Sequence, residues 1–260
     1  MTATDRIRGD ALLFYSMGIS SFIESTTPEY VVNLRRIFRG DADFMRWLEE
    51  TWQIEEVGHG LLMRDQLARH WPDFDLEAAY AQFASSYVPR CDASLLRPTP
   101  ALEALARCVT EAQAAASYRA LASYCPDLET MFLGMAADEA RHYSQFRRAF
   151  ERHNATEKHG RLRRLQIVVE RLLLVRDEDL PLGFAALNEH WRQPPPFVRQ
   201  DYAGYLKRMF ERLWWHFPFR AAGRMLTQPI GPSGSGEGWL AWVRLFGHPD
   251  GRLPVLDHPG

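Results

Sequence analysis

Residues 52–60 read WQIEEVGHG, and residues 136–142 read AADEARH. Both segments contain the pattern Glu-x-x-His, whose members are Glu56 and His59 in the first segment and Glu139 and His142 in the second. In an α-helix, residues three positions apart lie on one face, so each pattern presents a carboxylate beside an imidazole. One such pattern arises easily by chance, and its meaning depends on what the neighbouring helices place beside it.

Apolar residues recur at steps of three and four through most of the first 180 positions, with no alternation long enough for a strand. This periodicity predicts an all-α protein. The long helices are expected at 4–39, which Pro28 should kink or divide, at 41–71 after an Asp cap, at 100–125 after the cap Thr99, and at 126–154. Shorter helices are expected after Asp75, at 159–177 and at 202–217, and a flexible turn is expected in GPSGSGEG after Pro229.

The first two long helices form a hairpin with a predicted turn at Gly40. Glu56 lies 16 residues after this turn, and Glu24 lies 16 residues before it. Because both helices rise by about 1.5 Å per residue, the two carboxylates are expected at the same height in the antiparallel pair. Glu29 is a nearby competitor for the position of Glu24.

The next two long helices repeat this arrangement around a turn at Cys125. Glu139 lies 14 residues after the turn, and Glu111 lies 14 residues before it. Glu103 is a competitor for Glu111, but it lies two turns away and misses the height match. Each hairpin is therefore expected to add one glutamate to its Glu-x-x-His pattern.

One glutamate from each of two helices and a Glu-x-x-His from each of two others make the ligand set of ferritin-like di-iron or di-manganese bundles. The predicted metal ligands and catalytic residues are Glu24, Glu56, His59, Glu111, Glu139 and His142. Four carboxylates neutralise two divalent ions, whereas without metal they would repel one another and take up protons. Glu55 and Asp138 are expected to accept the second ring N–H of the histidines. The alternative is that these residues are surface charges of amphipathic helices.

The overall composition is that of an ordinary globular protein, with 46% apolar and 25% charged residues and a formal net charge of −2. No charge excess or module indicates nucleic acid. Cys91, Cys108 and Cys125 are odd in number and lack disulfide or metal-ligand spacing, so an oxidising compartment is not expected. The polar N-terminus lacks the charged-then-apolar order of a signal peptide, and no transmembrane segment is predicted. A cytoplasmic location is therefore expected.

The two patterns also resemble a known family. Residues 52–62 and 136–142 look like the two motifs of soluble acyl-acyl-carrier-protein desaturases, and Glu24, four residues ahead of Pro28, is similar to that family's first ligand segment. The resemblance covers roughly residues 15–150. It implies a non-haem di-iron oxidoreductase that uses O2, takes electrons from a ferredoxin-like donor and acts on an apolar acyl substrate, either free or bound to a carrier protein.

We therefore expect a ferritin-like four-helix bundle in residues 1–155 with a helical extension in residues 156–260, and we expect a homodimer. The cofactor is predicted to be two iron ions, with manganese as the alternative. Hydroxylation, N-oxygenation or aldehyde deformylation of a specialised metabolite are alternative reactions. From a different class, a ferritin-type iron-storage protein is the alternative, although the roughly 110 residues after the fourth long helix argue against it.

Three further features each have a functional and a structural interpretation. Small residues near Glu111 could line a substrate channel, with Ala114, Ala115 and Tyr118 as its wall, or they could serve close helix packing. An arginine-rich stretch could dock an acidic partner, or it could be a solvated face. It comprises Arg147, Arg148, Arg152, Arg161, Arg163 and Arg164. The aromatic residues Trp214, Trp215, Phe217 and Phe219 could form a lid, a dimer surface or a membrane-facing patch, or they could pack in the core.

Overall fold

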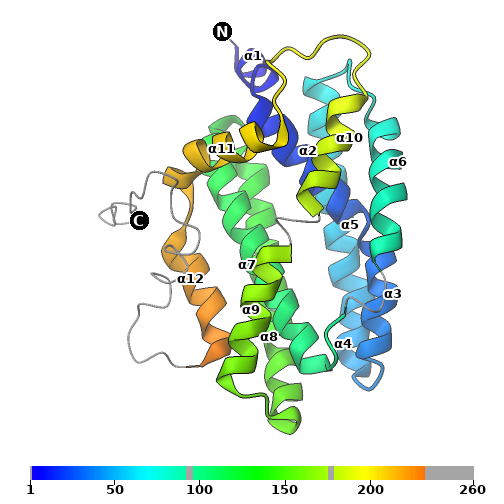
Figure 1. Ribbon diagram of the computed structural model, residues 1–260, viewed down its shortest axis with the longest axis vertical. Coiled ribbons are helices and arrows are strands. Elements are labelled where there is room, and N and C mark those ends of the chain that lie inside the picture. The colour runs from blue at the N-terminus through cyan, green and yellow to red at the C-terminus, as the bar shows by residue number, and fades with distance from the viewer. Residues whose placement is uncertain (1, 92–95, 175–178, 232–260) are drawn as a thin grey trace. The chain divides into compact units, whose positions relative to one another are not determined.

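The computed structural model describes residues 2–91, 96–174 and 179–231. The regular elements among these residues are helices, with no strand (Figure 1). An isolated antiparallel bridge joins Phe74 and Trp191. The helices are α1 Ala3–Arg8, α2 Ala11–Ser25, α3 Thr27–Ile37, α4 Ala42–Trp47, α5 Gln53–His70, α6 Leu76–Tyr87, α7 Pro100–Tyr124, α8 Glu129–Glu157, α9 Arg161–Leu174, α10 Leu180–Glu189, α11 Tyr202–Leu213 and α12 Phe219–Thr227. The predicted all-α class is confirmed. Among the described residues, no helix combines the length and apolar character needed to cross a membrane.

The helix predicted over 4–39 forms three helices, α1, α2 and α3. The division near Pro28 is confirmed, whereas the division at Asp10 was not predicted. The Asp10 carboxylate accepts hydrogen bonds from the backbone N–H groups of Leu12 and Leu13, so it caps a new helix there. The second break comes at Thr26, two residues before Pro28. Pro28 therefore lies in the first turn of α3, where its missing N–H costs nothing, and not inside a helix.

The second predicted helix is confirmed in its extent, since the helical path runs from α4 to the end of α5. Its cap is Asp41, whose carboxylate accepts from the backbone N–H of Phe44 at 3.1 Å. A π-helical turn, Leu48–Trp52, was not predicted and separates α4 from α5. This turn ends four residues before Glu56, and such turns are frequent beside functional residues.

The boundaries of the second hairpin follow the sequence signals closely. Thr99 Oγ1 accepts from the backbone N–H of Leu102 at 3.4 Å at the start of α7. A 3-10 turn, Pro126–Leu128, leads into α8. The left-handed residue Lys158 ends α8, so this helix continues three residues beyond the predicted end at 154. Both hairpin helices therefore have the expected lengths.

The C-terminal half differs more from the prediction. The arginine-rich helix and the aromatic helix are α9 and α11, but α10 and α12 were not predicted. The aromatic helix ends at Leu213 and a 3-10 turn, Trp214–His216, follows it. The predicted flexible turn GPSGSGEG lies outside the described residues from position 232 onward.

The chain consists of two compact units. The first unit comprises 1–103 and 170–202, and the second comprises 104–169 and 203–260. The division predicted from the sequence, into a core 1–155 and an extension 156–260, stays a prediction.

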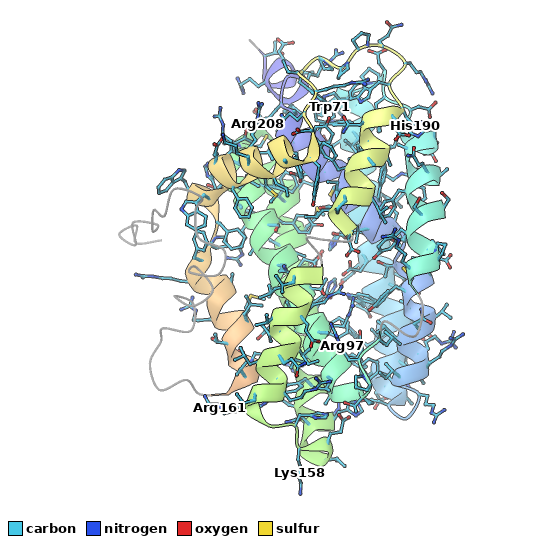
Figure 2. The ribbon with its side chains drawn as sticks, in the orientation of Figure 1. Trp71, Arg97, Lys158, Arg161, His190 and Arg208 are labelled. Carbon is cyan, nitrogen blue, oxygen red and sulfur yellow. The ribbon has the colours of Figure 1, made fainter. Side chains whose placement is uncertain are left out.

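An aromatic cluster forms the core at one end of the first unit. The ring of Phe14 contacts those of Trp71, Phe74 and Trp191 at centroid distances of 4.9–5.2 Å. Trp71, labelled in Figure 2, donates its indole N–H to the backbone carbonyl of Arg8 at 3.0 Å. These contacts join α1, α2 and the segments after α5 and α10, and so hold the N-terminal helices in place.

The core of the second unit contains the helices α7, α8 and α12. Phe132 and Phe146 of α8 are fully buried. Trp214 and Phe219 are also buried, with ring centroids 4.5 Å apart and Phe217 packed against them. Core packing is therefore the correct interpretation for these three aromatic residues. Trp215 differs, because it is 57% exposed.

Close contact between α2 and α5 positions the first Glu-x-x-His. Ser21 donates its hydroxyl to the backbone carbonyl of Gly60 at 3.1 Å. A Cβ atom at Gly60 would lie 3.0 Å from the backbone N of Ser25 and 3.1 Å from the backbone O of Ser21. Glycine therefore allows the two helix backbones to approach each other here.

We predict that Gly60→Ala destabilises the protein by about 1–3 kcal/mol, because the added methyl meets backbone atoms that cannot turn away. Thermal unfolding should show a melting temperature lower by several degrees, on the order of 2–4 °C per kcal/mol. Gly134→Ala is the matched control, since a Cβ there meets nothing within 4 Å. It should keep or raise the melting temperature. Equal losses in both variants would contradict this account.

Candidate functional site

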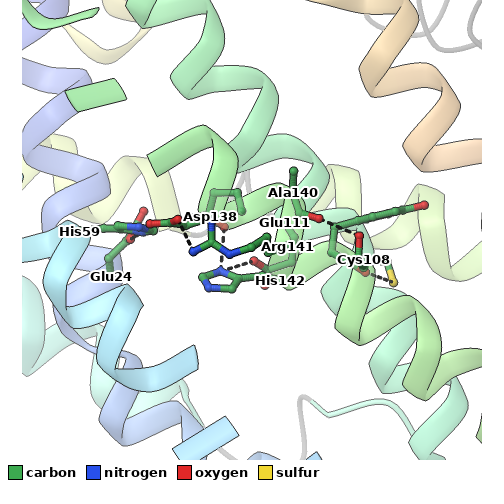
Figure 3. A network of polar contacts seen from close by, with 11 residues as sticks. Glu24, His59, Cys108, Glu111, Asp138, Ala140, Arg141 and His142 are labelled. Carbon is green, nitrogen blue, oxygen red and sulfur yellow. Dashed lines mark hydrogen bonds and ion pairs between the residues drawn. The ribbon is translucent and has the colours of Figure 1, made fainter. Parts of the chain in front are cut away.

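The first cluster of candidate ligands lies within the first unit. Glu24 comes from α2, and Glu56 and His59 come from α5. All three are buried, with exposed fractions of 3–7%. His59 Nδ1 lies 3.2 Å from Glu24 Oε2, and Figure 3 shows the two side chains facing each other. One ligand atom from each residue lies within 4.8 Å of the others, so this cluster could hold a metal ion.

The antiparallel packing of α2 and α5 explains this cluster. Ser21 contacts Gly60, and Glu24 contacts His59. Residue numbers therefore rise along α2 as they fall along α5, as expected for antiparallel helices. Glu24 lies one turn after Ser21 on α2 and is thereby directed at the Glu-x-x-His face of α5. The height match predicted from the sequence therefore exists in this pair of helices.

The competing acid Glu29 does not take part. It is exposed in the first turn of α3, whereas Glu24 is 6% exposed. The break at Thr26 places the two residues on different helices, α2 and α3.

The second cluster lies within the second unit and repeats the first. Glu111 comes from α7, and Glu139 and His142 come from α8, each at most 2% exposed. His142 Nδ1 is 3.5 Å from an oxygen of Glu111 and 3.5 Å from an oxygen of Glu139. Figure 3 shows His142 beside Glu111. One ligand atom from each of these residues also lies within 4.8 Å of the others, so this cluster could hold a metal ion as well.

The competing acid Glu103 has a structural role in the first unit. It is 1% exposed, and its carboxylate accepts from the Tyr30 hydroxyl at 3.2 Å and from the backbone N–H of Arg97 at 2.8 Å. The Arg97 guanidinium, labelled in Figure 2, in turn pairs with Glu170 at 2.8 Å. Hydrogen bonds within the chain therefore account for the burial of Glu103.

The second cluster is electrostatically unfavourable without a cation. The pKa of Glu111 is raised to about 8, chiefly by burial, while a hydrogen bond with His142 lowers it and the neighbouring charge of Glu139 adds to the rise. A carboxyl group in this state holds a proton at neutral pH. A divalent cation could replace that proton, because its positive charge balances the two carboxylates.

Sulfur does not belong to the donor set. Cys108 lies one turn ahead of Glu111 on α7 and is 1% exposed. Burial, assisted by the charge of Glu111, raises the pKa of the Cys108 thiol well above its usual range. The thiol therefore stays protonated, and its sulfur lies 4.0 Å from the backbone oxygen of Tyr143. Only carboxylate and imidazole donors remain in the clusters.

The other predicted residues occupy positions beside the ligands. Asp138 forms an ion pair with Arg141, and Glu55 is partly exposed. Their predicted contact with the histidine rings stays a prediction.

The predicted channel wall lies on α7, in the second unit. Ala115 and Tyr118 are buried, one and two turns after Glu111, and Ala114 is partly buried. A pocket of about 120 Å³ beside α7 is lined instead by Ser117 and Ala120, together with apolar residues from positions 209–219. The substrate channel therefore stays a prediction.

Arg107 is a buried residue of this region that the sequence analysis missed. It is 5% exposed and lies one turn after Glu103 and one turn before Glu111 on α7. A buried guanidinium requires partners. The spacing Glu-x-x-x-Arg-x-x-x-Glu in residues 103–111 is the signal that could have revealed it.

Comparison of the chain with protein-family models, with curated proteins and with solved structures gives no match. The donor chemistry of the two clusters therefore carries the functional assignment. Each cluster offers two carboxylates and one imidazole, a set that could hold a divalent metal ion and leave coordination positions open.

We predict that the metal-free protein becomes less stable as the pH rises from about 4.5 to about 8. The folded-state pKa of Glu111, about 8, lies above its usual value of 4.5. Its contribution to stability is therefore full below 4.5 and is lost as the pH rises through 8. Glu111→Gln should flatten this part of the profile, as measured by urea unfolding in the presence of a chelator. Glu29→Gln changes an exposed position and should leave the dependence of stability on pH as it is in the wild type. If Glu111→Gln also shows the wild-type dependence, Glu111 is not the group responsible.

Proposed function

We propose that the two clusters together hold two iron ions within a ferritin-like helical bundle, and that the protein is a non-haem di-iron oxidoreductase. The observation that supports this most strongly is the duplication. Each helical hairpin contributes a buried glutamate and a buried Glu-x-x-His, and in each hairpin the three side chains converge. Surface charges of amphipathic helices, the alternative interpretation, would not be buried in this way.

Charge balance supports a divalent ion in each cluster. Two carboxylates neutralise one divalent cation, so each hairpin can bury its own ion without a net charge. Three protein ligands per ion would leave coordination positions open. Iron is preferred to zinc in this proposal because oxygen-rich, open coordination suits a redox metal, and manganese is the alternative.

The chain's own residues bind, orient and shield the metal site. The fully buried Met63 lies one turn after His59 on α5. An apolar neighbour at this position excludes water and strengthens the electrostatic attraction between the carboxylates and a cation.

A hydrogen bond next to His142 holds α8 in position. The adjacent Tyr143 donates its hydroxyl to the backbone carbonyl of Met225 at 2.7 Å, which ties α8 to α12. A fixed helix keeps the imidazole oriented before the metal binds.

The chemistry that two bound ferrous ions supply is the reduction of dioxygen coupled to oxidation of an unactivated carbon chain. The proposed substrate is an aliphatic acyl group, free or bound to a carrier protein, and a ferredoxin-like protein is the proposed electron donor. Hydroxylation, N-oxygenation and aldehyde deformylation would use the same site, and a ferritin-type storage protein would bind iron without oxidising an organic substrate.

The decisive experiment supplies ferrous iron anaerobically and then adds O2 with a reductant and a set of acyl substrates. Oxygen uptake faster than that of free ferrous ion, together with a desaturated or oxygenated product in mass spectrometry, would support the proposal. Uptake without any organic product would indicate iron storage. Absence of uptake above the buffer rate would overturn the proposal. Spin coupling in the iron spectrum would separate a di-iron pair from two independent ions.

We predict that the wild-type chain binds close to two iron ions, and that Glu24→Ala lowers this number toward one. The lost carboxylate is a direct ligand, and its removal leaves Glu56 with one imidazole for the ion. Glu29→Ala is the matched control, five positions along the chain but exposed. Metal analysis after desalting measures both. Full iron content in Glu24→Ala would remove Glu24 from the site.

A further inference from the structure

The outer face of α5 carries an exposed apolar stripe. Ile54, Leu61 and Leu62 are 62%, 54% and 48% exposed. Together with Gly58 they occupy positions i, i+4, i+7 and i+8, which lie along one side of a helix. The candidate ligand Glu56 is two positions from both Ile54 and Gly58 and therefore points to the opposite side of the helix. Exposed leucine or isoleucine is ordinary when isolated, but a row along one helix face marks a surface for association.

Gly58 lies at the centre of this stripe, and no contact within the described chain requires a glycine there. A Cβ atom at Gly58 would meet nothing within 4 Å, whereas at Gly60 it would collide with α2. Glycine inside a helix costs about 1 kcal/mol relative to alanine. Its presence at an open position is explained if a second helix backbone approaches closely at that point.

The charges at the two ends of the stripe are complementary. Glu50, in the π-helical turn before α5, is exposed, and Arg69, near the end of α5, is also exposed. Neither forms an ion pair with another residue that the structure describes. An antiparallel crossing at Gly58 sets Ile54 against Leu62 of a second copy. It also brings Glu50 within about 4.5 Å, along the helix axis, of the second copy's Arg69.

We propose that the outer face of α5 is a self-complementary interface through which two copies of the chain form an antiparallel, two-fold symmetric dimer. A two-fold interface brings the same patch of both copies together, so one stripe supplies both sides. The apolar residues form the dry centre, and the Glu50–Arg69 pairs form the rim. This inference is independent of the proposed metal chemistry, because none of the residues that it uses is a candidate metal ligand.

Sedimentation velocity on the full chain, from about 1 to 100 µM, tests the proposal, since a compact interface of this kind dissociates in roughly the micromolar range. The wild type should be a dimer at the upper end of this range. Leu61→Glu places a charge in the centre and should raise the dissociation constant by at least about 100-fold. Leu162→Glu, at an 84% exposed position on α9, is the matched control and should leave the dimer intact.

Charge reversal provides a test that does not depend on the apolar core. Glu50→Arg and Arg69→Glu should each weaken the dimer by about 3- to 10-fold, and the double variant should restore it, because the swapped charges again face each other. Gly58→Ala should weaken the dimer while raising the melting temperature of the monomeric Leu61→Glu protein. Circular dichroism verifies that each variant is folded.

Three outcomes would overturn the proposal. The first is a wild-type chain that stays monomeric at 100 µM, because the stripe would then be a surface for a partner other than a second copy. The second is a dimer that Leu61→Glu does not weaken, because the interface would then lie elsewhere. The third is a charge-swapped double variant that is weaker than both single variants.

Discussion

The cost of burying carboxylates is the constraint on which the rest of the structure depends. Glu111 is 2% exposed and its pKa is raised to about 8, so the folded chain retains a group that prefers water. A sequence would not keep such a group without compensation. For Glu103 the compensation is visible as hydrogen bonds from Tyr30 and Arg97. The neighbours of Glu111 are another acid and an imidazole. A bound cation would compensate the cost of burying these three groups.

This constraint explains why the candidate ligands lie on long, well-anchored helices. A three-residue spacing keeps a carboxylate and an imidazole on one face only if the helix stays regular, and α5 and α8 are both regular through their patterns. The π-helical turn is placed before the pattern of α5 and not within it. Glycine at position 60 then brings α2 close enough for Glu24 to reach His59.

The sequence alone sufficed for the features that depend on local periodicity and capping. The caps at Asp41, Asp75 and Thr99 and the two Glu-x-x-His faces are local signals, and the structure contains all of them. The break at Thr26 lies two residues before Pro28, which was the local signal for a kink or division, and only its exact position was not predicted. The helices α10 and α12 depend on tertiary packing, for example through the hydrogen bond from the Tyr15 hydroxyl to Asn188, which no periodicity reveals.

The two glycines of α5 show how far a residue's role depends on its surroundings. Gly58 and Gly60 are two positions apart and therefore point in nearly opposite directions. At Gly60 the chain itself supplies the close approach, and α2 is the neighbour. At Gly58 the chain supplies nothing, and the flanking Ile54 and Leu61 are exposed. Glycine at position 60 therefore allows α2 to approach α5 closely. In our proposal, glycine at position 58 allows a second copy to do the same at the outer face. Dimerisation would then hold α5 from its outer face while α2 holds it from the inner one, and the helix that carries Glu56 and His59 would be fixed from both sides.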